Sequence, residues 1–123
     1  MPYSILEDGT TLRATMHGVM TGDEFHRFTG EIAAMMALRS HWPNNLIDVR
    51  AVEPSRLSFN DVLSLAKIRE AVTPPNPIRT ALVAGSPAMI GFARMFQSLN
   101  HNPSITIEVF TDVAAAERWL TAA

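Results

Sequence analysis

The sequence predicts a single α/β domain with a mixed, mostly parallel five-stranded sheet, an N-terminal hairpin at one edge and about four helices. The main observation is a local pattern that occurs three times: an apolar, strand-like run reaches a small or acidic residue, and a helix begins soon afterwards. The three runs are residues 45–50, 79–85 and 105–112. Strands that alternate with helices need crossover connections, and such connections produce a parallel sheet.

Length and charge narrow the class of protein. The chain has 123 residues, the usual size of one domain, so we expect residues 1–123 to share one core. Charged residues make up a rather low 18%, which suits a homodimer or a protein partner about as well as a monomer with a large core. The net charge is −2 and the ten basic residues are scattered. Nucleic-acid-binding proteins concentrate positive charge on one face, so we expect no nucleic-acid partner.

Composition also bears on compartment and cofactors. The chain has no cysteine, which excludes disulfides, thiolate chemistry and cysteine metal sites. Residues 1–8 lack the charged-then-apolar layout of a signal peptide, and no apolar run approaches the ~20 residues of a membrane span. The four histidines are dispersed without a recognised ligand spacing. We therefore expect a cytoplasmic protein with no membrane span, no metal and no other cofactor.

The first half of the chain predicts a hairpin, a helix and a strand. Residues 3–7 and 12–17 are strand-like runs joined by an Asp-Gly turn, which suits a hairpin. A capping box at residues 21–24 precedes apolar residues at helical spacing and predicts a helix to about residue 39. The short apolar run at residues 46–49 predicts a strand that is covered on at least one face.

The second half predicts three helices and two strands. A second capping box at residues 58–61 begins a helix that the proline-rich residues 73–77 end. A strand over 79–84 leads to a helix capped by Ser86, and the last strand leads to a helix capped by Asp112. The buried side of the first of these helices is predicted to consist of Phe59, Val62, Leu63, Ala66 and Val72.

The sequence offers little support for enzymatic chemistry. Ser86 lies on a strand-to-helix turn, where α/β-hydrolases carry their nucleophile, but Ala84 and Ala88 replace the glycines of their Gly-x-Ser-x-Gly pattern. Pro87 follows Ser86 and has no N–H, so one of the two oxyanion-hole donors would be missing. No other nucleophile and base can be paired from the sequence. We therefore interpret Ser86 as a helix cap and expect no enzymatic turnover.

One acidic residue stands out within an apolar strand. Asp48 interrupts the run at residues 46–49 near its carboxyl end, and Arg50 follows two residues later on the same side of the pleat. The pair could form a local ion pair that closes the loop, or it could form the polar floor of a pocket. The sequence leaves both interpretations open.

A ligand site is predicted at the carboxyl ends of the strands. In parallel sheets ligands bind at this edge, where helix N-termini present free N–H groups to anions. Small residues after the strand at 79–84 would allow a ligand to approach closely, and Arg50 would hold an anionic group. The predicted ligand-binding residues are Asp48, Arg50, Ser58, Gly85, Ser86 and Met89.

Seven methionines form a further signal. Met35, Met36, Met89 and Met95 fall on predicted helices that are apolar on more than one face. Methionine fills irregular spaces, so core packing is the simpler interpretation, and an apolar ligand groove or partner interface is the alternative.

As a whole, the chain resembles the SpoIIAA-like family, within the wider STAS and CRAL-TRIO-like group. The resemblance rests on the element order together with residues 46–50, 79–84, 91–96, 109–112 and 115–120. It implies consecutive parallel strands that lie side by side, an N-terminal hairpin at one edge, and a non-catalytic regulatory or ligand-binding role.

The predicted binding role involves a small anionic or amphipathic ligand or a protein partner. The resemblance adds two alternatives to this role. STAS relatives that antagonise anti-sigma factors are phosphorylated in an Asp-Ser-Ser/Thr-Gly motif that opens the second helix. This chain lacks the motif there, and Ser55 and Ser58 are the nearest hydroxyls. CRAL-TRIO relatives carry apolar lipids. A phosphorylation-dependent interaction switch and an apolar-ligand carrier therefore remain open as alternatives.

Overall fold

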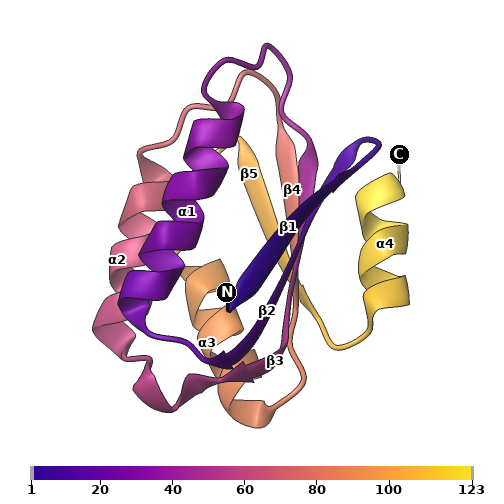
Figure 1. Ribbon diagram of the computed structural model, residues 1–123. Helices are drawn as coiled ribbons and strands as arrows, with labels where there is room; N and C mark the ends of the chain where they lie inside the picture. Colours follow the sequence, from indigo (N-terminus) through magenta and orange to yellow (C-terminus); the bar gives the residue numbers. More distant parts are fainter. Residues whose placement is uncertain (1, 123) are drawn as a thin grey trace.

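Five strands form one sheet whose spatial order, β1-β2-β3-β4-β5, follows their order in the sequence. The computed structural model describes residues 2–122 (Figure 1). The strands are β1 (Tyr3–Asp8), β2 (Thr11–Val19), β3 (Asn44–Glu53), β4 (Ile78–Val83) and β5 (Ile105–Phe110). The helices are α1 (Gly22–Met36), the 3-10 turn η1 (Pro54–Arg56), α2 (Phe59–Glu70), α3 (Pro87–Ser98) and α4 (Val113–Thr121).

Strand directions match the predicted fold class. β1 pairs antiparallel with β2, while β2 to β5 pair in parallel. The turn between β1 and β2 has Gly9 at φ 61°, a backbone angle that glycine adopts without strain. The prediction of a mixed, mostly parallel five-stranded sheet with an N-terminal edge hairpin and four α-helices is therefore confirmed.

Strand β3 is longer than the predicted run at residues 46–49. It pairs with β2 on one side along most of its length and with β4 over its first half. The pairing with β2 shifts between Asp48 and Ala51, where β3 gains one residue relative to its partner. This bulge changes which side chains point to each face of the sheet beyond Asp48.

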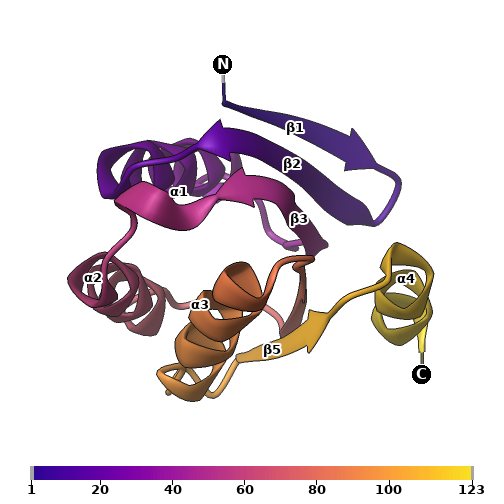
Figure 2. The same ribbon diagram turned by 90° about the horizontal axis from the view of Figure 1, so that it is seen from below.

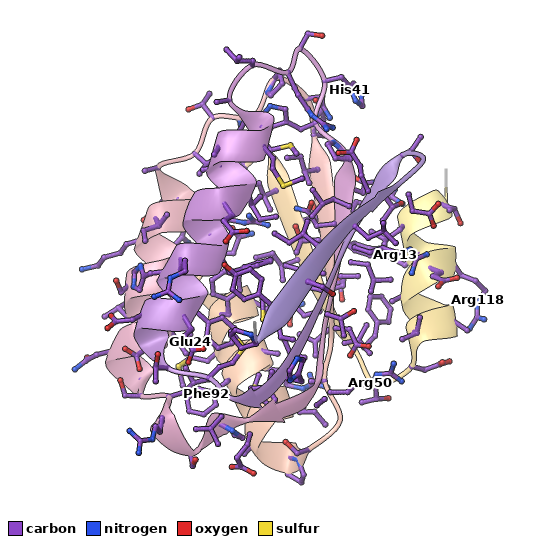
Figure 3. The ribbon with its side chains drawn as sticks, in the orientation of Figure 1. Arg13, Glu24, His41, Arg50, Phe92 and Arg118 are labelled. Carbon is purple, nitrogen blue, oxygen red and sulfur yellow. The ribbon has the colours of Figure 1, made fainter. Side chains whose placement is uncertain are left out.

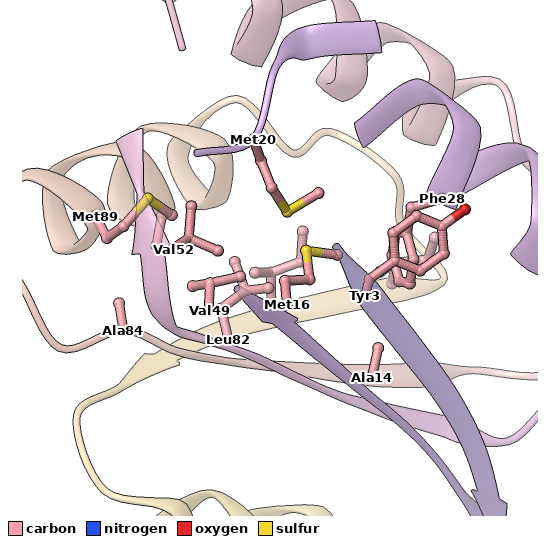
Figure 4. Close-up of a cluster of buried hydrophobic side chains, with 13 residues drawn as sticks. Tyr3, Ala14, Met16, Met20, Phe28, Val49, Val52, Leu82, Ala84 and Met89 are labelled. Atoms are coloured by element: carbon pink, nitrogen blue, oxygen red, sulfur yellow. The ribbon is translucent and has the colours of Figure 1, made fainter. Parts of the chain in front are cut away.

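The helices cover the two faces unequally. Figure 2 shows α1, α2 and α3 on one side of the sheet and α4 alone on the other. We call these sides the three-helix face and the α4 face. The three-helix face carries the larger core, with Tyr3, Met16, Met20, Phe28 and Met89 among its buried residues (Figure 4). The α4 face carries a smaller core made of Leu46, Ala81, Val83, Ala116 and Leu120.

All the predicted helix caps are present. The capping boxes at Thr21 and Ser58 have both of their hydrogen bonds, and Ser86 and Asp112 each accept a bond from the first turn of their helix. Each helix begins where a parallel strand ends, so the helix N-termini gather at the carboxyl edge of the sheet. Phe59 departs from prediction: it is 54% exposed because it lies at the first position of α2, beyond the buried stripe that starts at Val62.

The starts of α1 and α2 approach each other closely at Gly22. A Cβ atom at Gly22 would lie 2.3 Å from the Asp61 Oδ1 atom, so a larger residue cannot fit without moving that carboxylate. The carboxylate cannot move freely, because its Oδ2 accepts the Ser58 N–H at 2.9 Å. The small residue thus lets the two capped helices pack side by side.

Gly22→Ala is expected to destabilise the protein relative to Gly30→Ala by about 1 kcal/mol or more, because the new methyl group displaces the capping carboxylate. Gly30 is the matched control: it is exposed on the same helix with nothing near its Cβ position, so alanine there raises helix propensity without a clash. Urea denaturation measures both free energies of unfolding. Equal stability of the two variants, or a difference that persists in an Asp61→Ala background, would contradict this account.

Candidate functional site

Asp48 and Arg50 form a bidentate pair in the middle of β3, at its bulge and beside the carboxyl end of β4. The Arg50 Nε atom donates to Asp48 Oδ1 at 3.0 Å, and an Arg50 Nη atom donates to Asp48 Oδ2 at 2.8 Å. The backbone N–H of Arg50 also donates to Asp48 Oδ1 at 3.0 Å. The local ion pair, one of the two predicted interpretations, is therefore what the geometry shows.

The pair lies on the α4 face of the sheet. Figure 3 shows Arg50 near the connection between β5 and α4, away from Phe92 on the three-helix face. Gly85 lies against it, since a Cβ atom at Gly85 would be 3.5 Å from the Arg50 Cβ atom. Three of the predicted site residues, Asp48, Arg50 and Gly85, are thus brought together.

Electrostatics at this pair favour the charged forms. Burial of the Asp48 carboxyl tends to raise its pKa, but the hydrogen bonds from the Arg50 side chain and backbone outweigh this, and the pKa is lowered. The pKa of Arg50 is raised, first by its hydrogen bonds to Asp48, then by the charge of Asp48, with a further contribution from the charge of Asp112. Arg50 already faces two carboxylates, so an added anion would compete with Asp48 for the guanidinium.

The other predicted site residues lie elsewhere. Ser86 caps α3, where its Oγ atom accepts the Met89 N–H at 3.2 Å, and the Met89 side chain is buried in the core of the three-helix face. Ser58 is exposed and caps α2 through Asp61, whose carboxylate accepts the Ser58 N–H. Ser58, Ser86 and Met89 thus lie at helix starts and Gly85 follows the end of β4, whereas Asp48 and Arg50 lie inside β3. The sheet separates the Asp48–Arg50 pair from the Met89 side chain. Their joint role in binding stays a prediction.

Two adjoining cavities lie between the sheet and the three-helix layer. The carboxyl-end cavity has a volume of about 110 Å³ and is lined by side chains that include Val49, Leu65, Met89 and Ala93. The amino-end cavity, of about 250 Å³, lies under the starts of the strands, beside Leu12 and Ile78. Phe28, Thr29, Ile47 and Arg69 line both cavities, so these four side chains form the partition between them.

Arg69 is a site residue that sequence reasoning missed. It is half-buried near the end of α2, and one Nη atom donates to the hydroxyl of Thr80 on β4 at 2.8 Å. Its Nε atom is enclosed without a hydrogen-bond partner. Burial lowers the pKa of Arg69 to about 10, so the guanidinium stays charged at neutral pH. The available signal was spacing, because position 69 continues the stripe of Val62, Leu65 and Ala66.

A serine and a histidine also meet between α1 and α2. Ser64 Oγ and His26 Nε2 lie 3.2 Å apart, a contact that the sequence did not suggest. Both residues lie inside helices, where the backbone N–H groups bond to carbonyls one turn earlier and are not free to stabilise an oxyanion. The contact is a hydrogen bond that joins the two helices.

Residues 2–122 contain neither a metal-binding cluster nor a membrane-spanning helix. No group of three or more His, Asp or Glu side chains in this range could hold a metal ion. None of the helices in this range combines the length and the apolar character needed to cross a bilayer.

Asp48→Asn is expected to lower the free energy of unfolding at pH 7 by about 1 kcal/mol, a value reduced because Arg50 is half exposed. The folded-state pKa of Asp48 is lowered, so its stabilisation is complete above the unfolded-state value of about 3.9 and is lost as the pH falls through the folded-state value. The gap between wild type and variant should therefore close as the pH is lowered below about 4 in denaturation titrations.

Glu53→Gln is the matched control for this series. Glu53 is exposed on the same strand and has no hydrogen bond or ion pair from its side chain within the described residues. Its substitution should leave stability almost unchanged across the same pH range. A gap for Asp48→Asn that stays constant with pH would show that the charge of Asp48 contributes nothing.

Comparison with known proteins supplies a structural relative. No family model matches the chain, and no curated protein matches it. The crystal structure of an uncharacterised protein of the DUF3478 family with a SpoIIAA-like fold, from Shewanella loihica PV-4, superposes with a TM-score of 0.62. The match covers 96% of this chain and 91% of that one, at 18% sequence identity. Such a likeness concerns the backbone, and it agrees with the sheet order and helix placement described above: the chain has a SpoIIAA-like fold.

Proposed function

We propose that the chain is a non-enzymatic, cytoplasmic ligand-binding module of the STAS-like type, which holds an amphipathic ligand between the sheet and helices α1 to α3. The observation that carries the proposal is the pair of adjoining, largely apolar cavities of about 110 and 250 Å³ on the three-helix face. The proposal combines two of the functions predicted from the sequence: binding of an amphipathic ligand and carriage of an apolar ligand.

The cavities are large enough to hold a small organic ligand. Protein interiors pack densely and rarely leave voids much larger than a water molecule. An apolar cavity of about 150 Å³ stays dry and binds a molecule as large as benzene. The amino-end cavity alone exceeds that volume, and the carboxyl-end cavity adjoins it across one layer of side chains.

The predicted polar site at the carboxyl edge is the weaker location for a ligand. The Arg50 guanidinium is already held by Asp48 in two hydrogen bonds, which an incoming anion would have to replace. Of the six predicted site residues, only Met89 lines a cavity. We therefore place the ligand in the interior, with Met89 as the residue common to both hypotheses.

A phosphorylation-dependent switch is also the weaker alternative. Ser55 and Ser58 are both exposed, as a modified hydroxyl must be. However, Ser58 caps α2 beside the Asp61 carboxylate. A phosphate there would bring a charge of about −1.5 to −2 next to a carboxylate, and like charges repel.

Ala93→Leu tests the proposal by filling the carboxyl-end cavity from α3. The probe is 1-decanol, added to the ¹⁵N-labelled full chain and followed by amide chemical shifts. Wild type should show saturable shifts concentrated at Met89, Ala93 and other residues lining the cavities. The variant should bind about tenfold more weakly, because the loss of space for one or two methylenes costs about 0.8 kcal/mol each.

Ala88→Leu is the matched control, since Ala88 is exposed on the same helix. It should bind decanol as wild type does. Decanol shifts that do not saturate, that spread over the exposed surface, or that are unaffected by Ala93→Leu would contradict the proposed function.

A further inference from the structure

Arg69 is the one charged side chain among the residues that line the two cavities. All the other lining residues are apolar, or are the neutral polar residues Thr29 and Asn45. Arg69 lines both cavities and lies at the partition between them. The positive charge of Arg69 therefore faces an otherwise uncharged, largely apolar space, unlike the charged side chains on the protein surface.

The positive charge of Arg69 has no carboxylate paired with it among residues 2–122. By contrast, Arg13, whose Nε atom is likewise enclosed, has both Asp8 and Glu117 beside it. Among the described residues, the Arg69 guanidinium donates one hydrogen bond, to the neutral hydroxyl of Thr80. The Nε–H donor of the same guanidinium is enclosed and has no hydrogen-bond partner within the described residues.

The neighbouring polar groups do not neutralise the charge. The Asn45 amide nitrogen donates to the same Thr80 Oγ atom at 3.4 Å, so two donors share one acceptor. Burying a charge without a partner is costly, and proteins normally retain such a group only when something pairs with it. An anion from outside the chain would supply the missing partner.

We propose that the ligand of this module is a single-chain amphiphile with one carboxylate head, which Arg69 binds while the apolar chain occupies the cavities on the three-helix face. This inference rests on the proposed function and names the chemical class of its ligand. The planar guanidinium matches a carboxylate, which can accept two parallel hydrogen bonds from it. The adjoining aromatic and aliphatic side chains of Phe28 and Ile47 suit an alkyl chain.

The single positive charge also selects the head group. One carboxylate balances one guanidinium, whereas a phosphate monoester carries close to two negative charges at neutral pH. In the part of the chain that the structure describes, no second cation lines either cavity to balance the extra charge. A neutral head group such as a hydroxyl could accept a hydrogen bond from Arg69, but it would leave the positive charge unbalanced.

The test compares three probes with the same ten-carbon chain, namely decanoate, 1-decanol and decyl phosphate, on the full chain at pH 7 by calorimetry and amide shifts. Wild type should bind decanoate about tenfold or more tightly than decanol, the scale of hydrogen bonds to a charged group, and decyl phosphate more weakly than decanoate. Arg69→Met should abolish the preference for decanoate and leave decanol binding intact. Lys67→Met, which removes an exposed cation from the same helix, should keep the preference.

Each outcome decides a separate point. Equal binding of decanoate and decanol by wild type, or a preference that survives in Arg69→Met, overturns the assignment of Arg69 and leaves the proposed function standing. Tighter binding of decyl phosphate overturns the choice of a carboxylate. Binding of none of the three probes overturns the proposed function itself. If Arg69→Met does not fold, the wild-type comparison and Arg69→Lys, which should retain a weakened preference, still decide the question.

Discussion

Parallel pairing of β2 to β5 is the constraint on which the rest of the structure depends. Each parallel pair needs a crossover helix, and the crossovers after β2, β3 and β4 all lie on the same face of the sheet (Figure 2). Only α4, which follows the last strand, covers the other face. The side chains of α1, α2 and α3 must therefore cover most of the three-helix face. The two cavities lie in this layer, between the sheet and the helices.

Arg50 and Arg69 differ in whether the protein itself balances their positive charge. Arg50 lies at the bulge of β3, half exposed, and a carboxylate two residues away neutralises it through the backbone geometry of the strand itself. Arg69 lies on the core side of α2, and within residues 2–122 its guanidinium donates a hydrogen bond to a hydroxyl and pairs with no carboxylate. The charge of Arg50 is therefore balanced by the protein itself. The charge of Arg69 is not, and for this reason we assign it to an anionic ligand.

Local chemistry explains how much of the fold could be predicted from the sequence. Helix caps such as Thr21 with Glu24, and the glycine turn at Gly9, depend on residues a few positions apart, so their signals are fully contained in the chain. The Asp48–Arg50 pair was predictable for the same reason, as one of two interpretations. The family resemblance then supplied the side-by-side order of the strands.

The candidate site was harder to predict because it depends on packing between distant elements. Which helix covers which face separates Asp48 from Met89, and no local pattern contains that information. Arg69 meets Thr80 because α2, in the connection between β3 and β4, packs on the three-helix face (Figure 2), and a basic residue near the end of a helix is ordinarily assigned to the surface. Phe59 shows the opposite error: it is an apolar residue that was expected on the buried side of α2 but is exposed at the first position of that helix.

The most direct measurement is a crystal structure of the full chain grown with saturating decanoate. We expect continuous density for the alkyl chain between the sheet and the helices of the three-helix face, with the carboxylate within hydrogen-bonding distance of the Arg69 guanidinium. Density confined to the Asp48–Arg50 pair on the opposite face, or cavities that stay empty at saturation, would contradict it.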